Sequence, residues 1–255
     1  MCNISFYAIV TIIKYRIKDF FKEYHYSILA PLINTLLFVI IFKTIDNYYS
    51  LTMDGKSFID FLIPGLILMV VVQESYDHTS VTLINMKQIG SFDDFLMAPI
   101  SRIEIFFALI LSSIIIGFII SVINLFFLSF FVNFQNIDFK YFFYFLLLAI
   151  IFFSSLGSII GFVAFSWDTQ SSVSSFFVTP INFLSGTFFS INVLPESLKF
   201  LFIYNPYYYI VNNFRNSFDL NYYFKFQENI IIIFFVLISI ILSTYVFHAG
   251  FRVIK

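Results

Sequence analysis

Residues 60–104 read DFLIPGLILMVVVQESYDHTSVTLINMKQIGSFDDFLMAPISRIE. The mostly apolar run over residues 62–84 is long enough to cross the roughly 30 Å hydrocarbon core of a bilayer as a helix. A polar interruption follows, and then Ser101 and Glu104 form a helix-capping signature directly before a second apolar run. This order predicts two membrane-spanning helices joined by a short segment that faces water.

The joining segment has the features of a short helix of its own. Ser91 precedes Asp94 by three residues, a spacing typical of a helix start, because the hydroxyl caps a backbone N–H and the carboxylate lies near the positive end of the helix dipole. Pro99 cannot continue the helix. The apolar residues of the segment share one face: Phe92, Phe95 and Leu96. We predict a helix over residues 91–98 that a protein outside the membrane contacts; the alternative is a loop that only turns the chain at the lipid surface.

Composition places the whole chain in the membrane. Of its 255 residues, 60% are hydrophobic and only 11% are charged, whereas charged residues make up roughly a quarter of a soluble domain. The 40 phenylalanines carry no functional assignment, since a codon bias gives the same excess. A net charge of −1 gives no indication of nucleic-acid binding, and the single Cys2 excludes an intrachain disulfide.

Six apolar runs approach the length of a membrane span, and they lie near residues 28–42, 62–84, 105–131, 141–165, 173–191 and 230–248. The runs are continuous rather than alternating, which favours helices over the strands of a β-barrel. The sequence therefore predicts an all-α membrane protein with a six-span core over residues 26–255. No linker or shift in composition divides residues 1–255 into more than one domain.

The N-terminal residues, 1–25, predict an amphipathic helix that lies flat on the membrane surface. Apolar residues recur at helical spacing: Phe6, Val10, Ile13, Ile17, Phe20 and Tyr24. Lysines occupy another face: Lys14, Lys18 and Lys22. A helix packed on a partner protein is the alternative. With Arg16, these lysines place the N-terminus in the cytoplasm, and six spans return the C-terminus to the same side.

The region before the last span predicts two short helices. Pro180 and Gly186 interrupt the fifth apolar run, and further prolines punctuate the residues after it. Residues 192–218 then give two apolar-faced segments separated at Asn205. We predict a re-entrant pair that caps a path through the membrane, tolerated only where protein or water satisfies the freed backbone groups; an ordinary outer loop is the alternative. The candidate gate residues are Pro195, Pro206, Tyr207 and Arg215.

Glu74, Asp77 and His78 lie on the cytoplasmic half of the second span. Ionisable groups in lipid are costly and usually face a cavity or one another. Lining of a substrate entrance, a proton relay, a metal site and a structural hydrogen-bonded cluster remain open. Further candidates for a path between two protomers come from the fifth run: Asn182, Phe183, Ser185, Phe188 and Phe189.

Several motifs, taken together and in order, resemble those of ABC-2 type transporter permeases. They are Phe61-Leu62-Ile63-Pro64-Gly65-Leu66, the run from Gly90 to Ser101, Thr179-Pro180 with Leu184-Ser185-Gly186, Leu194-Pro195, and Asn205-Pro206 with Arg215. Ser91-Phe92-Asp93 is a more aromatic version of the usual family motif. The resemblance implies a half-transporter in the bacterial cytoplasmic (inner) membrane that pairs with a second copy or a related permease and works with a soluble ABC ATPase. It also implies that Ser91, Phe92, Asp94, Phe95, Leu96 and Pro99 form a coupling helix to that ATPase.

The chain has no phosphate-binding loop of its own. Gly55-Lys56-Ser57 has Ser50 where the first glycine of such a loop should stand. We therefore expect no cofactor on this chain, with ATP and Mg²⁺ held by the partner, and no enzymatic activity. A membrane-embedded enzyme acting on a lipid-linked substrate is the alternative from another class, but it needs more converging catalytic groups. The apolar spans favour export of a hydrophobic or amphipathic compound; a polysaccharide or lipid-linked glycan is the alternative.

Overall fold

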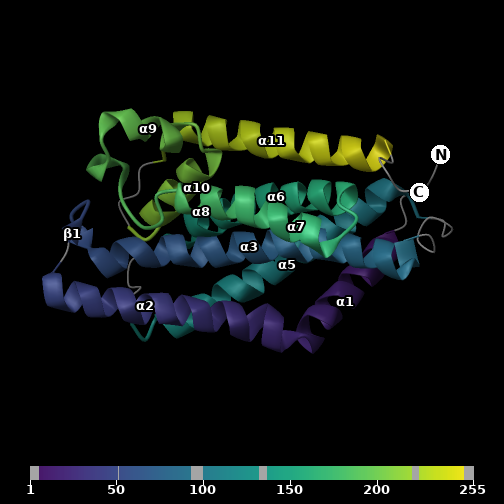
Figure 1. The fold of residues 1–255 in the computed structure, drawn as a ribbon, viewed down its shortest axis with the longest axis horizontal. Coiled ribbons are helices and arrows are strands. Elements are labelled where there is room, and N and C mark those ends of the chain that lie inside the picture. The colour runs from purple at the N-terminus through teal and green to yellow at the C-terminus, as the bar shows by residue number, and fades with distance from the viewer. Residues whose placement is uncertain (1–5, 51, 93–99, 132–136, 220–223, 250–255) are drawn as a thin grey trace.

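Helix α3 (Phe58–Ile89) is the central element of the fold, with α2 on one side of it and α6 on the other (Figure 1). The computed structural model describes residues 6–50, 52–92, 100–131, 137–219 and 224–249. In the apolar window of α3, 72% of the residues are buried inside the protein, against 17% for the helix that contains α2. The remaining helices therefore pack around α3, and α2 is peripheral.

The elements follow one another in this order. The first half contains α1 (Phe6–Lys22), the π-helical turn η1 (His25–Leu29), α2 (Ala30–Tyr49), strands β1 (Thr52–Met53) and β2 (Lys56–Ser57), α3 and α5 (Arg102–Leu128). The second half contains α6 (Phe139–Val163), α7 (Trp167–Val173), η2 (Ser174–Val178), α8 (Thr179–Phe183), η3 (Ile191–Val193), α9 (Glu196–Ile203), α10 (Pro206–Asn216) and α11 (Phe226–Ala249). One end of the bundle holds α1 and the start of α7, and the other end holds β1 and α9 (Figure 1).

Five helices in the described part of the chain are long and apolar enough to cross a membrane: His25–Tyr49, Phe58–Ile89, Ile103–Leu128, Phe139–Val163 and Phe226–Ala249. They account for five of the six predicted spans, so the expectation of an all-α membrane protein is confirmed. The predicted span at 173–191 is not among these five helices. Its helical part consists of α7, η2 and α8 and ends at Phe183, and Gly186 then has a φ of +78° that breaks the helical path.

Helices α3 and α6 approach each other closely through glycines of α6. A Cβ atom at Gly161 would lie 2.8 Å from both Cα and O of Ser80, and one at Gly157 would collide with the carbonyl oxygen of Tyr76. Small residues allow helices in a membrane to pack backbone to backbone. The small-residue pattern of α6 therefore serves a contact within this chain.

Helix α1 packs one stripe of residues inward against α5. The buried residues of the stripe are four apart: Ile12, Arg16 and Phe20. The predicted lysine face (Lys14, Lys18 and Lys22) is exposed. The predicted apolar face divides, because Phe20 is buried in the protein while Phe6 remains 76% exposed. The side chain of Arg16 thus lies in the interior, where its charge was not expected.

The segment between α3 and α5 is described only at its two ends. Gly90 ends α3 with a φ of +79°, as a glycine after a helix often does. The predicted capping box before α5 is present: Ser101 Oγ accepts from Glu104 N (3.2 Å), and Glu104 Oε2 accepts from Ser101 N (2.5 Å). Four predicted coupling residues, Asp94, Phe95, Leu96 and Pro99, lie outside the described residues.

Two short helices, α9 and α10, occupy the region predicted to be re-entrant, and the break between them is at Asn205 as expected. The Asn205 side chain begins α10 by accepting from Tyr207 N (3.0 Å). Its Nδ2 donates to Ile181 O (3.0 Å) and Leu184 O (2.9 Å) and so attaches the pair to α8. Whether the pair dips into the membrane stays a prediction.

Candidate functional site

A cleft of about 350 Å³ lies beside the middle of α3, between η1, α2 and α8; we call it the membrane cleft. Its apolar wall comes mostly from α2 and α3: Phe38, Leu66, Met69 and Val70. Its polar groups come from α2, α3 and α8: Asn34, Thr35, Gln73, Glu74 and Asn182. A concave, mainly apolar surface with a few polar groups is the usual form of a small-molecule site.

A second cleft of about 160 Å³ lies between α1, α3 and α5; we call it the charged cleft. Its ionisable residues come from α1, from the turn after it and from α3: Arg16, Asp19, Glu23, Glu74, Asp77 and His78. Glu74 lines both clefts. The structure thus brings the three predicted intramembrane residues together with charged residues near the N-terminus that the sequence did not connect with them.

Asp77 is the centre of a hydrogen-bonded network that joins α3 to α7 and η2. Gln73 Nε2 donates to Asp77 Oδ2 (2.8 Å), and Gln170 Nε2 donates to Asp77 Oδ1 (2.7 Å). The same two amides also contact Ser174 Oγ (3.0 Å) and Ser80 Oγ (3.2 Å). Asp77 is therefore a structural residue in this arrangement. No local sequence pattern marked Gln170, because its partner lies 93 residues away.

His78 and Arg16 lie at the charged cleft with different partners. The His78 ring contacts Ser112 Oγ of α5 at 3.2 Å. Arg16 is 6% exposed, lies 3.7 Å from the Asp19 carboxylate, and its Nε has no hydrogen-bond partner among the described residues. Burial lowers the pKa of Arg16, while the charge of Asp19 opposes this shift. In the part of the chain that the structure describes, no group of three or more His, Cys, Asp or Glu residues could hold a metal ion.

The predicted path residues of the fifth run divide between two places. Asn182 is 1% exposed, lines the membrane cleft, and its Oδ1 has no partner among the described residues. Ser185 Oγ donates to Asn182 O (2.6 Å). The Phe183 and Phe188 rings stack with centroids 5.2 Å apart. Phe189 instead contacts Phe202 of α9, at 5.5 Å. Asn182 is thus the member of this set that lines the cleft.

Arg215 fixes α10 to the start of α3. It is 6% exposed, and its Nε donates to Phe61 O (2.9 Å) while Nη2 donates to Gly186 O (2.6 Å). The guanidinium also lies 3.6 Å from the centre of the Phe61 ring. Burial lowers the pKa of Arg215 to about 10, so it remains charged at neutral pH.

The other predicted gate residues are part of the packing around α9 and α10. Tyr207 is fully buried, its ring meets Phe153 of α6 edge-on at 4.9 Å, and its hydroxyl has no partner among the described residues. Pro206 is in the first turn of α10, and Pro195 precedes α9. Pro206, Tyr207 and Arg215 therefore belong to α10, which packs on α3 and α6, whereas Pro195 precedes α9, which contacts α10.

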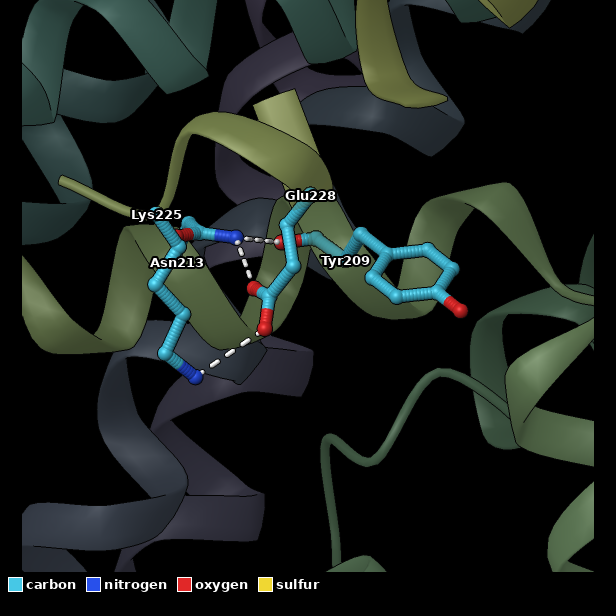
Figure 2. Close-up of polar contacts among 4 residues, drawn as sticks. All are labelled: Tyr209, Asn213, Lys225 and Glu228. Carbon is cyan, nitrogen blue, oxygen red and sulfur yellow. Dashed lines mark hydrogen bonds and ion pairs between the residues drawn. The ribbon is translucent and has the colours of Figure 1, made fainter. Parts of the chain in front are cut away.

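Helix α10 is also tied to the beginning of α11. Figure 2 shows Asn213 Nδ2 donating to both Tyr209 O (2.8 Å) and Glu228 Oε2 (2.8 Å). Lys225 Nζ donates to Glu228 Oε1 (3.0 Å). Glu228 is thus shared by two partners, and the sequence analysis did not identify it.

The two described residues of the predicted coupling helix lie at the end of α3. Phe92 is 3% exposed and packs edge-on against Phe162 of α6, with centroids 5.9 Å apart. Ser91 Oγ donates to Met86 O (3.4 Å). Lys87 Nζ reinforces the contact with α6 by donating to Phe162 O (2.8 Å) and to Ala164 O. The last carbonyl groups of a helix have no partner within the helix, and the Lys87 ammonium group supplies one to the end of α6. The segment after α3 is therefore anchored on α6.

Two comparisons with known proteins found similar sequences. A sequence profile described as ABC-2 type transporter matches residues 7–218, a range that includes both clefts. The chain is 27% identical over 218 residues to the inner membrane transport permease YadH of Escherichia coli K12, an alignment that covers 86% of this chain and 85% of that protein. The protein of the same name from Shigella flexneri has the same identity and coverage.

Proposed function

The chain belongs to the ABC-2 type transporter family, and from this premise we propose that it forms the membrane pathway of an exporter driven by a separate, soluble ATP-hydrolysing subunit. Membership makes it a transport permease rather than a catalytic enzyme. The similarity to an inner membrane permease supports a place in the bacterial inner membrane. The exposed lysines of α1 favour an orientation with the N-terminus in the cytoplasm.

The membrane cleft is the observation that carries the proposed pathway. It opens beside α3 in a bundle of membrane-length helices and combines an apolar wall with Glu74 and Asn182. An amphipathic compound fits such a surface, because its apolar part can contact the wall while a polar group meets one of these side chains. We propose that the cleft, completed by a second copy of the chain, holds the compound during export.

We propose that the segment after α3 couples the cleft to the ATPase. Since Phe92 is buried against Phe162, its role is to attach the coupling segment to α6 rather than to contact the partner. The partner then binds residues 93–99, and a displacement of this segment passes to the ends of α3 and α6 through Phe92 and Lys87. ATP binding would bias the bundle between inward-open and outward-open arrangements.

We propose that α9 and α10 close the pathway at the opposite end. The pair is joined to α3 by Arg215 and to α11 by Glu228, so a movement of either helix reaches it directly. The break at Asn205 and Pro206 separates α10, which buries its apolar face in the protein, from α9, whose apolar side chains are mostly exposed.

Purification of the tagged chain from its native membrane tests the proposal. We expect a soluble ATPase to copurify, and we expect proteoliposomes that contain both proteins to export an amphipathic compound only with ATP. A partner ATPase that lacks its phosphate-binding lysine provides the control. Transport by the purified chain alone would refute the proposed division of labour.

A further inference from the structure

Two acceptor groups at the membrane cleft have no hydrogen-bond partner among the described residues. The Glu74 carboxylate makes no hydrogen bond or ion pair with any residue that the structure describes. Asn182 Oδ1 is buried and also lacks a partner there. The amide nitrogen of Gln73 is already used, because it donates to Asp77 and Ser174. Among the described residues that line the cleft, none supplies a positive charge to balance Glu74.

The remaining lining of the cleft suits a cation. None of the described residues that line it is a lysine, arginine or histidine. Two aromatic side chains, Tyr26 and Phe38, line it, and aromatic faces attract organic cations through the ring quadrupole. Met69 adds a polarisable and adaptable surface.

The charged cleft, which also reaches Glu74, carries an excess of negative charge. Four carboxylates line it, namely those of Asp19, Glu23, Glu74 and Asp77, against Arg16 and His78. Arg16 faces Asp19 at 3.7 Å, so its charge is partly compensated. A surface with an excess of one charge raises the local concentration of the opposite ion. A cation that reaches Glu74 from this side therefore passes a surface that attracts it.

We propose that the membrane cleft recognises an amphipathic organic cation, whose positive charge lies against the Glu74 carboxylate and whose apolar body contacts Leu66, Met69 and Phe38. The proposal rests on the transport role proposed above, and it adds the chemical class of the compound. Glu74 is partly buried, and a carboxylate without a partner is costly in a membrane, so a bound cation would reduce that cost. Asn182 supplies a second acceptor to the same ligand.

Two ions of nearly the same size and shape and opposite charge test the proposal: tetraphenylphosphonium and tetraphenylborate. Each is titrated into lipid nanodiscs that contain the purified chain, with empty nanodiscs subtracted. We expect saturable binding of the phosphonium and at least about tenfold weaker binding of the borate, since a close charge pair contributes strongly to affinity in a desolvated site. Equal binding of the two ions by the unmodified protein would overturn the proposal without any variant.

Variants then locate the site. Glu74→Gln keeps the size of the side chain, and we expect it to weaken phosphonium binding by about tenfold or more. Glu196→Gln on α9 is the matched control, because Glu196 is exposed, pairs only with Lys199 among the described residues, and lies outside the cleft; it should bind as the unmodified protein does. Glu74→Lys should reverse the preference toward the borate. Unchanged phosphonium binding by a folded Glu74→Gln protein would also overturn the proposal.

The ATPase is absent from these titrations, so the two proposals can fail separately. If the protein shows no preference for the cation, the proposed compound class is refuted and the ATPase-driven pathway is not. If no ATPase copurifies, the pathway is refuted and the cation-binding result is unaffected.

Discussion

Replacing Gly157 with alanine tests the backbone contact between α3 and α6. The added methyl group would lie 3.0 Å from Tyr76 Cα and would collide with Tyr76 O and Thr79 Oγ1. Two of these three atoms belong to the backbone of α3, so no side-chain rotation can relieve the contact. The two helices must separate at the centre of the fold.

The expected loss of stability follows from two opposing terms. Overpacking of a close interior contact costs about 1–3 kcal/mol. Alanine recovers about 0.5–1 kcal/mol relative to glycine within a helix. We therefore expect Gly157→Ala to lower the free energy of unfolding by about 1–2 kcal/mol.

Gly117→Ala on α5 is the matched control. Its new methyl group would lie 2.6 Å from Cδ1 and 2.9 Å from Cγ1 of Ile150 and 3.4 Å from Ser75 Oγ, all of which are side-chain atoms rather than backbone. We expect a change within about 0.5 kcal/mol, because relief of the contact and helix propensity nearly cancel. Unfolding by sodium dodecyl sulfate in mixed micelles, followed by the fluorescence of the single Trp167, measures both variants. A Gly157→Ala protein as stable as the Gly117→Ala protein would contradict the backbone contact.

Three further substitutions are measured by the same titration. Arg215→Met leaves the carbonyl oxygens of Phe61 and Gly186 without their donor, and we expect a loss of about 2–4 kcal/mol in the free energy of unfolding, partly offset because a buried charge is also removed. An unchanged unfolding midpoint would contradict the role of Arg215 in fixing α10 to α3. Glu228→Gln should change stability by no more than about 0.5 kcal/mol, since Lys225 of the ion pair is half exposed and a glutamine oxygen can still accept from Asn213 Nδ2. Phe92→Ala should cost about 3 kcal/mol by opening a cavity beside Phe162, and in the complex it should leave ATP hydrolysis running with less transport.

Local patterns in the sequence were sufficient for much of the fold. Five spans follow from apolar length, and the capping box at Ser101 and the helix break at Asn205 follow from interactions within a few residues. The span expected at 173–191 shows the limit of this approach. Pro180 and Gly186 marked an interruption of this run, and the helix does end at Phe183. The sequence did not show that Arg215, 29 residues later, donates to Gly186 O at this turn.

The candidate site was predictable only where a single residue was unusual for its surroundings. Glu74 and Asn182 are polar residues in apolar runs, and both line the membrane cleft. Arg16 looked like one more basic residue of a surface helix, and no local pattern marked Gln170. Their positions depend on how α1 packs on α5 and how α7 packs on α3, which no pattern within either segment records.

Lys87, Gly157 and Gly161 together have a mechanical consequence. Contacts at one end and along the length of α3 and α6 join these two helices into a rigid unit, since close-packed backbones do not deform gradually. We therefore expect the working cycle to be a motion of this unit relative to elements that contact it less closely, above all α2. Spin labels on α3 and α6 should keep one fixed distance throughout turnover. The distance between a label on α2 and a label on α3 should take two values.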